Sequence, residues 1–152
     1  GRRRWCMLVV ERDHGGDLAV ARRLGEAGAG NDQRDSDGAT TWTRNSQSGK
    51  VRVARLLLEA GADKDKADSD GCTPLINASH NGHLEVARLL LEAGADKDKA
   101  DPDGDTPLTR ASHTGHLEVA RLLLEAGADK DTADSDGCTP LITASHNGHL
   151  EV

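Results

Sequence analysis

The histidines of this sequence recur in a pattern that could bind a metal ion. Six of the seven histidines form three pairs with a period of 33 residues: His80 and His83, His113 and His116, and His146 and His149. Imidazole nitrogens are common zinc ligands, and two of them three residues apart can share one face of a helix. Here a glycine, such as Gly82, lies inside each pair and interrupts the helix. We therefore expect the histidines to recur because the whole sequence recurs, and we expect no metal site.

The aspartate-rich segments between these pairs could bind calcium. Asp101, Asp103 and Asp105 take carboxylate positions of a calcium-binding loop. However, Lys99 falls on the position of the first ligand, and Arg110 falls on that of the bidentate glutamate. Because two cations at ligand positions would repel the ion, we interpret these segments as solvated turns.

Cys72 and His80, with nearby aspartates, supply the residue types of a nucleophile, a base and an orienting acid. Nothing in their spacing forms a pocket that would exclude water. Cys138 repeats the position of Cys72 two units later, at a distance of roughly 20 Å, which exceeds the reach of a disulfide. We expect free thiols, no enzymatic activity, no cofactor and no small-molecule substrate.

Composition restricts the classes of partner. The formal net charge is -7 and the pI is about 5.4, which argues against nucleic acid, because nucleic-acid binding requires a basic surface. The apolar run near the start, at 5–10, is too short for a membrane span, and we expect no membrane association. Three cysteines without metal-ligand spacing are typical of a reducing compartment. We expect a cytoplasmic protein, with a nuclear location as the alternative.

A tandem repeat sets the positions of these residues. Thr73, Thr106 and Thr139 open three TPL segments 33 residues apart, and glycines follow the same period. The sequence contains no Phe and no Tyr, which disfavours a large globular core but suits closely stacked helices of Ala and Leu. We predict an all-α solenoid of stacked units, each of which depends on its neighbours for stability.

Each unit is predicted to contain a turn and two helices. In DSDGCTPL, the Asp, Ser and Gly cluster favours a turn, Thr73 can cap a helix, and Pro74 suits the first helical position. This short helix should run from Pro74 to about His80 and end at Gly82. The apolar spacing of HLEVARLLLEAG predicts a second helix that ends at Gly94.

These motifs resemble the ankyrin repeat. T-P-L, then A, then G-H, then L-L-L-E-A-G-A-D on a 33-residue period are similar to that family over essentially the whole chain. The resemblance implies a β-hairpin turn and two antiparallel helices per unit. It also implies a structural role for the second histidine of each pair, at the start of the second helix. It also implies a curved solenoid that binds partners at the hairpin tips and first helices of its concave face. The single array, 1–152, then comprises a degenerate repeat 1 at 1–37, repeat 2 at 38–70, repeat 3 at 71–103, repeat 4 at 104–136 and a truncated repeat 5 at 137–152.

Two repeats depart from this pattern. In repeat 2, TTWTRN replaces TPLINA, which puts Trp42 at a leucine position and Asn45 at the position of a small buried alanine. A buried amide without hydrogen bonds is costly, so we expect the first helix of this repeat to be weak. In repeat 5, Leu141 and Ile142 lack a second helix that would cover them. We expect this repeat to fray, and we expect the sequence to be a fragment of a longer protein.

Differences between the copies indicate where a partner binds. Most of them fall on turns or on the exposed side of the first helix, which fits either neutral drift or selection for a partner. The expected contact residues are Asp70, Cys72, Asn77, His80, Asn81, Asp103, Asp105, Arg110, His113 and Thr114. We predict a non-enzymatic scaffold that binds a protein or peptide, preferably a basic one, on this face. The alternatives are a targeting or regulatory segment of a larger enzyme or channel, and a mainly structural array.

Overall fold

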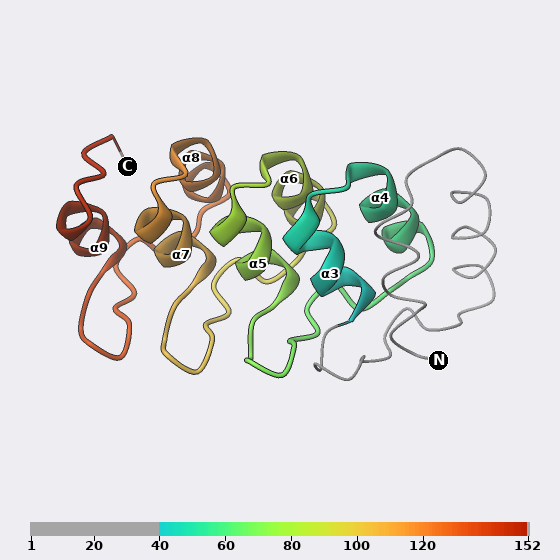
Figure 1. Ribbon diagram of the computed structural model, residues 1–152, viewed down its shortest axis with the longest axis horizontal. Coiled ribbons are helices and arrows are strands. Elements are labelled where there is room, and N and C mark those ends of the chain that lie inside the picture. Colours follow the sequence, from blue (N-terminus) through green and yellow to red (C-terminus); the bar gives the residue numbers. More distant parts are fainter. Residues whose placement is uncertain (1–39, 152) are drawn as a thin grey trace.

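The computed structural model describes residues 40–151, apart from the side chains of Thr41 and Ser48. The degenerate repeat 1 lies outside the described residues. The helices follow the chain in this order: α3 (Thr41–Ser48), α4 (Val51–Glu59), α5 (Pro74–Asn81), α6 (Leu84–Glu92), α7 (Pro107–Thr114), α8 (Leu117–Glu125) and α9 (Pro140–His146). Each of repeats 2 to 4 thus contributes two helices, and repeat 5 contributes one (Figure 1).

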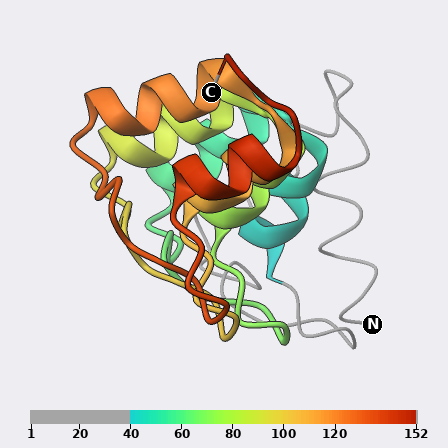
Figure 2. The same ribbon diagram turned by 90° about the vertical axis from the view of Figure 1, so that its left-hand side faces the viewer.

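The helices form two rows. The first helices of the repeats, α3, α5, α7 and α9, contact one another in that order, and the second helices, α4, α6 and α8, do the same. Each second helix also packs on the first helix of its own repeat. The loops between repeats extend beyond the row of first helices, on the side away from the second helices (Figures 1 and 2). Loops and first helices therefore share one side of the array.

The first helices begin and end where their sequence predicts. Thr73 Oγ1 accepts a hydrogen bond from Ile76 N at 3.3 Å, and Pro74 takes a first-turn position that needs no amide donor. Gly82 follows the last residue of α5 with a φ of 72°, a left-handed conformation that glycine adopts without strain. Thr106 caps α7 in the same way. The predicted first helix is confirmed and is one residue longer than expected.

Small and aliphatic side chains form the core between the two rows. The buried positions of the second helices recur with the period of the repeat: Val53, Ala54 and Leu57, then Val86, Ala87 and Leu90, then Val119, Ala120 and Leu123. Leu75 and Leu108 of the first helices complete this core. Alanine at the central position of each set allows neighbouring helices to approach closely without aromatic side chains. The core is therefore continuous along the array rather than confined to one repeat.

The first helix of repeat 2 forms as a regular helix. α3 forms with Thr40 as its cap, and Thr40 Oγ1 accepts a hydrogen bond from Thr43 N at 3.2 Å. Trp42 takes the place that Leu75 has in repeat 3 and is fully buried, as is Asn45. The large indole adds apolar area to the core at this position, which offsets the less favourable residue types around it. The prediction of a weak helix rested on the burial of the Asn45 amide. Trp42 Nε1 is buried without a hydrogen-bond partner among the described residues, and the weakness of the helix stays a prediction.

The predicted β-hairpins are tight turns. Within residues 40–151 no residue is in a β-strand. Each turn is closed by two backbone bonds: Asp68 N donates to Cys72 O at 3.0 Å, and Gly71 N donates to Asp68 O at 3.0 Å. Such a closure does not extend into a ladder of paired residues, which a strand requires.

The second histidine of each pair links neighbouring repeats. His83 Nε2 lies 2.8 Å from the carbonyl oxygen of Gln47, and His116 Nε2 lies 3.1 Å from that of His80. Because a carbonyl oxygen only accepts, Nε2 carries the proton and donates in each bond. A Cβ on Gly82 would lie 2.6 Å from the His116 ring, so glycine is required there for close packing. These histidines therefore have the structural role that the resemblance implied, because they bond to the backbone of the preceding repeat.

The last repeat exposes apolar side chains that earlier repeats bury. Leu75 and Leu108 are 1% and 2% exposed, whereas the equivalent Leu141 is 71% exposed. Ile142 is 41% exposed, although the equivalent Ile76 is 1% exposed. This exposure agrees with the expectation that nothing in 137–151 covers α9, and the fraying of the repeat stays a prediction.

Candidate protein-interaction surface

The repeats differ both on the first helices and at the turns that precede them. We call these the α5 turn (68–72), the α7 turn (101–105) and the α9 turn (134–138). The first aspartate of each turn organises its backbone. Asp68 Oδ1 accepts hydrogen bonds from Asp70 N at 3.0 Å and from Cys72 N at 2.9 Å. Asp101 and Asp134 make the same two bonds in their own turns. In each case Oδ2 is left for another partner.

That second oxygen has different partners in the α5 and α7 turns. Asn77 Nδ2 of α5 donates to Asp68 Oδ2 at 3.3 Å. Arg110 takes the same position on α7, and its Nη2 and Nε donate to Asp101 Oδ2 at 2.5 Å and 3.2 Å. The Asp101 side chain is only 1% exposed. A buried carboxylate needs such a charged or polar partner, because burial without one is unfavourable.

Arg110 is the centre of an ion cluster in the α7 turn. Its Nη2 lies 3.2 Å from Asp105 Oδ2 and 3.9 Å from Asp103 Oδ2. Burial lowers the pKa of Arg110, but the hydrogen bond to Asp101 and the charge of Asp105 raise that pKa above its ordinary value overall. Burial raises the pKa of Asp105, and the charge of Arg110 opposes this shift. The guanidinium therefore stays charged and neutralises part of the turn.

The ten predicted contact residues all lie in the α5 and α7 turns or on α5 and α7. The exposed ones are Asp70, His80, Asn81, Asp103 and His113, and the partly buried ones are Cys72, Asn77, Asp105, Arg110 and Thr114. Several of the partly buried ones bind within the repeat. Asn77 and Arg110 hold turn aspartates, and Thr114 Oγ1 donates to Arg110 O at 2.9 Å. The structure brings the ten residues to one side of the array, and their contact with a partner stays a prediction.

The first histidine of each pair lies exposed on consecutive first helices. These residues are His80, His113 and His146, on α5, α7 and α9. Burial lowers the pKa of His80, and the positive charges of Arg110, His113 and His116 lower it further. At neutral pH the His80 imidazole is therefore uncharged. It does not offset the negative charge of the turns.

The cysteines of the described residues are free thiols. Cys72 and Cys138 are partly buried and form no disulfide. Burial and the negative charge of Asp68 raise the pKa of the Cys72 thiol from 9.0 to about 11. Because the thiolate is the nucleophile, this environment makes Cys72 unreactive at neutral pH. The prediction of free thiols near the turns is confirmed for these two cysteines, and Cys6 lies outside the described residues.

Neighbouring turns also contact each other. Ser135 N of the α9 turn donates to Asp103 O of the α7 turn at 2.9 Å. Pro102 takes the equivalent place one repeat earlier and has no N–H to donate. Its ring instead packs on Gly71, where a Cβ would lie 2.5 Å from Pro102 Cδ. The tips of consecutive turns are therefore held side by side.

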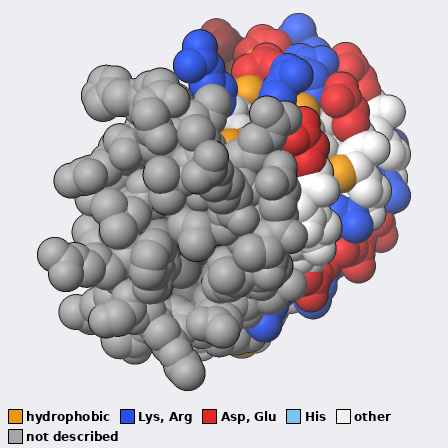
Figure 3. Space-filling view, turned by 90° about the vertical axis from the view of Figure 1, so that its right-hand side faces the viewer, with side chains coloured by type: hydrophobic (Ala, Val, Ile, Leu, Met, Phe, Trp, Pro, Cys, Tyr) orange, Lys and Arg blue, Asp and Glu red, His pale blue; other side chains and the backbone are white. Residues whose placement is uncertain are grey.

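The rest of the described surface offers little chemistry. Acidic and basic side chains are mixed over the described part of the face in Figure 3, with small hydrophobic areas between them. Across 40–151 no three His, Cys, Asp or Glu side chains are grouped to bind a metal ion. None of the helices in that range combines the length and the apolarity that crossing a bilayer requires.

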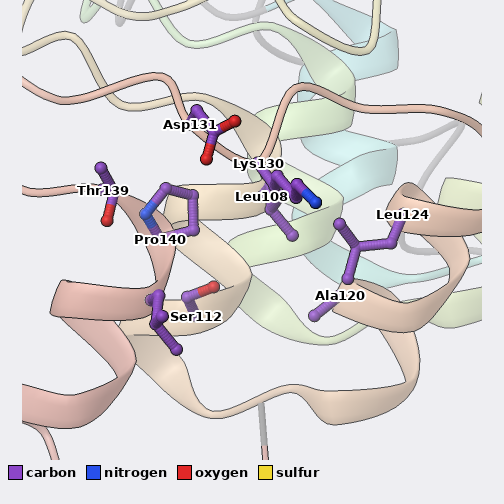
Figure 4. A pocket seen from close by; sticks show the side chains of 9 residues that line it. Leu108, Ser112, Ala120, Leu124, Lys130, Asp131, Thr139 and Pro140 are labelled. Atoms are coloured by element: carbon purple, nitrogen blue, oxygen red, sulfur yellow. The ribbon is translucent and has the colours of Figure 1, made fainter.

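A hollow of about 400 Å³ lies where α7, α8 and α9 meet (Figure 4). Leu108, Ala120, Leu124 and Pro140 give it an apolar wall, with Lys130 beside it. Its lining includes no histidine and no cysteine.

Sequence reasoning missed the buried turn aspartates, which are the residues that determine this surface. Asp68 and Asp101 are 8% and 7% exposed. Asp134 takes their place in the third turn. A signal was present, because this aspartate recurs at every period while the residues one and four positions later change.

Comparison with known families identifies the architecture. A family model of ankyrin repeats (3 copies) matches residues 6–101 and 94–152. The chain belongs to the ankyrin-repeat family. Ankyrin repeats are generally protein–protein interaction modules and are typically not enzymes. The family and the solenoid fold predicted from the sequence are thereby confirmed. No curated protein is similar enough to this ankyrin-repeat chain to count as a relative.

Proposed function

We propose that this ankyrin-repeat array binds a basic segment of a partner protein along its turn face. The turn face comprises the α5, α7 and α9 turns and the exposed sides of α5, α7 and α9. The observation that carries this proposal is the charge of the turns. The α5 and α9 turns each have two carboxylates and no cation, and the α7 turn has three carboxylates and one guanidinium. With Arg110 of α7 counted with the α7 turn, each turn therefore has a net charge of -2.

The arrangement of these charges supports an extended contact. Asp70, Asp103 and Asp136 are exposed at equivalent places in consecutive turns, and the Asp103 side chain is 80% exposed. Packed helices lie about 8 to 10 Å apart, so the three carboxylates form a row along the array. A row of like charges attracts a segment with opposite charges and increases its association rate. Several weak contacts then combine along the partner.

The test reverses the charge of this row. In the triple variant Asp70→Lys, Asp103→Lys and Asp136→Lys, we expect the affinity for a peptide that alternates arginine with glycine and serine to fall at least about tenfold. These three side chains are exposed, so the substitutions leave the buried turn aspartates in place. Fluorescence anisotropy of a labelled peptide measures the affinity. Repeating the titration at higher salt should weaken binding to the unmodified array.

The matched control makes the same charge change on the second helices. Glu85, Glu92 and Glu118 are exposed on α6 and α8, and replacing each with lysine changes the net charge equally. Binding should survive these replacements. Equal losses in both triple variants would indicate a response to net charge alone and would refute the turn face. Arg110 is unsuitable for this test, because its removal leaves Asp101 buried without a cation.

A further inference from the structure

The α9 turn lacks the internal partner that the other two turns have. Asp134 Oδ1 accepts the backbone bonds from Asp136 N and Cys138 N, both at 2.9 Å. Within residues 40–151, no side chain donates to Asp134 Oδ2. The residue at the position of Arg110 is Thr143, whose side chain is too short to reach across the turn. This carboxylate oxygen is therefore available to a donor from outside the chain.

A second observation at the same position points to an external group. Thr143 is only 8% exposed, and its Oγ1 has no hydrogen-bond partner among the described residues. Thr143 is the fourth residue of α9, as Arg110 is the fourth residue of α7, so both side chains leave their helices in the same direction. A buried hydroxyl without a partner is unfavourable, and a donor placed beside Asp134 would provide one.

The α7 turn shows what kind of group fits there. In that turn Arg110 Nη2 lies 2.5 Å from Oδ2 of Asp101, the first aspartate of the turn. It lies 3.2 Å from Oδ2 of Asp105, four positions later. The backbone hydrogen bonds of the two turns match bond for bond. A planar cation with several N–H donors therefore suits this backbone geometry. In the α9 turn it would have to enter from the partner.

We propose that the α9 turn is a recognition niche for one arginine side chain of the partner. The guanidinium would donate to Asp134 Oδ2 and to the Thr143 hydroxyl oxygen, with Asp136 as the nearby exposed carboxylate. This niche rests on the proposed function, because it gives one basic residue of the partner a defined place. It also orients the complex, since the equivalent places in the α5 and α7 turns are filled by Asn77 and Arg110.

The test uses a small molecule that carries the guanidinium group of arginine. N-acetylarginine amide is titrated into the folded array, and the amide shifts of Asp136 and Cys138 are followed by NMR. We expect saturable shifts there and smaller ones at Asp103 and Asp105, because Arg110 already fills the α7 turn. N-acetylcitrulline amide, which has the same shape without the charge, should produce little change. Equal shifts from both compounds would overturn the proposal.

Two substitutions of Thr143 sharpen the result. Thr143→Arg places the chain's own guanidinium in the niche, as in α7, and should abolish the shifts and weaken probe binding about tenfold. Thr143→Val keeps the shape and the carboxylates but removes the hydroxyl acceptor, so it should weaken probe binding, although less than Thr143→Arg does. Circular dichroism confirms that both variants fold. Undiminished shifts in Thr143→Arg would contradict the niche.

Failure of this inference can be separated from failure of the proposed function. If the arginine-containing peptide binds Thr143→Arg as tightly as the unmodified array but does not bind the triple lysine variant, the niche is wrong and the turn face stands. If the small probe shifts the α9 turn but the peptide fails to bind the array, the niche stands and the extended interface is wrong.

Discussion

The α5 and α7 turns have the same backbone and different side chains, and the difference shows how the repeats vary. Both turns bury an aspartate that accepts two backbone amides. In the α5 turn the neutral amide of Asn77 donates a hydrogen bond to this aspartate, Asp68. In the α7 turn the guanidinium of Arg110 donates to Asp101. The α7 turn also has Asp105 where the α5 turn has a cysteine. An added cation and an added anion thus appear together, 3.2 Å apart.

This coupling gives the sequence differences an explanation beyond drift or a partner. Arginine in place of asparagine adds one positive charge, and aspartate in place of cysteine adds one negative charge that balances it. The two changes leave the net charge of the turn unaltered while they strengthen the internal contacts of the α7 turn. Differences between copies at positions 105 and 110 are therefore best described as one internal compensation. Positions 70, 103 and 136, which retain aspartate throughout, are better candidates for common contacts.

The largest expected effect comes from removing the cation of the α7 turn. Arg110→Ala leaves the Asp101 carboxylate, whose side chain is 1% exposed, without its charged partner. We expect the free energy of unfolding to fall by about 3 kcal/mol, the lower end of the range for breaking a buried ion pair, because the Arg110 side chain is 24% exposed. Urea unfolding followed by circular dichroism measures the loss. A change below about 0.5 kcal/mol, typical of exposed positions, would contradict a structural role for Arg110.

The control for that variant converts one turn into the other. Asp105→Cys combined with Arg110→Asn gives the α7 turn the side chains of the α5 turn. Because asparagine donates to the buried aspartate in α5, the double variant should recover most of the stability that Arg110→Ala loses, to within about 1 kcal/mol of the unmodified array. If the double variant is as unstable as Arg110→Ala, the two turns are not interchangeable and the comparison fails.

A smaller effect is expected at the cysteine of the α5 turn. Burial and the charge of Asp68 raise the pKa of Cys72 to about 11, from 9.0. At pH near 8 the thiolate fraction then falls about a hundredfold, and the higher nucleophilicity of the more basic thiolate recovers part of this loss. In a Cys6→Ser, Cys138→Ser background we expect alkylation of Cys72 by iodoacetamide to be about tenfold slower in the folded array than in urea. Equal rates would show that the α5 turn does not protect the thiol.

Much of the fold was predictable from local residue types. Thr73 and Pro74 start a helix and Gly82 ends it for reasons that need no tertiary contact, and the structure places all three as expected. Local rules did not determine the complete burial of Trp42, which depends on packing against neighbouring repeats, whereas the period of the repeat predicted the burial of Asn45. The hairpin implied by the resemblance failed for a similar reason, since strand pairing depends on how far the partner segments run together.

The location of the candidate site was predictable from the sequence, but the hydrogen bonds and ion pairs within the site were not. The sequence put Asp105 and Arg110 on the side of the array that carries the turns and first helices, where the structure also places them, and their contact with a partner stays a prediction. It did not show that they bind each other, or that Arg110 holds Asp101 nine residues earlier. Such a contact follows from the geometry of a turn and not from helical spacing, so side-chain rules for helices do not find it.

The smallest expected effect concerns His80 on α5, whose pKa is lowered in part by Arg110 on α7. The pKa of His80 is lowered first by burial and next by Arg110, with His113 and His116 contributing less. In Asp105→Cys with Arg110→Asn, the loss of the positive charge should raise this pKa toward its ordinary value, but only partly, because burial remains. Since folding lowers the pKa, protonation of His80 opposes folding, so its contribution to stability is lost as the pH falls from 6.5 through the lowered pKa of the folded state. NMR titration of the ring measures the pKa, and Arg121→Gln on the outer side of α8 serves as the control. A His80 pKa that is unchanged in the double variant would show that the α7 cluster does not act on the α5 helix.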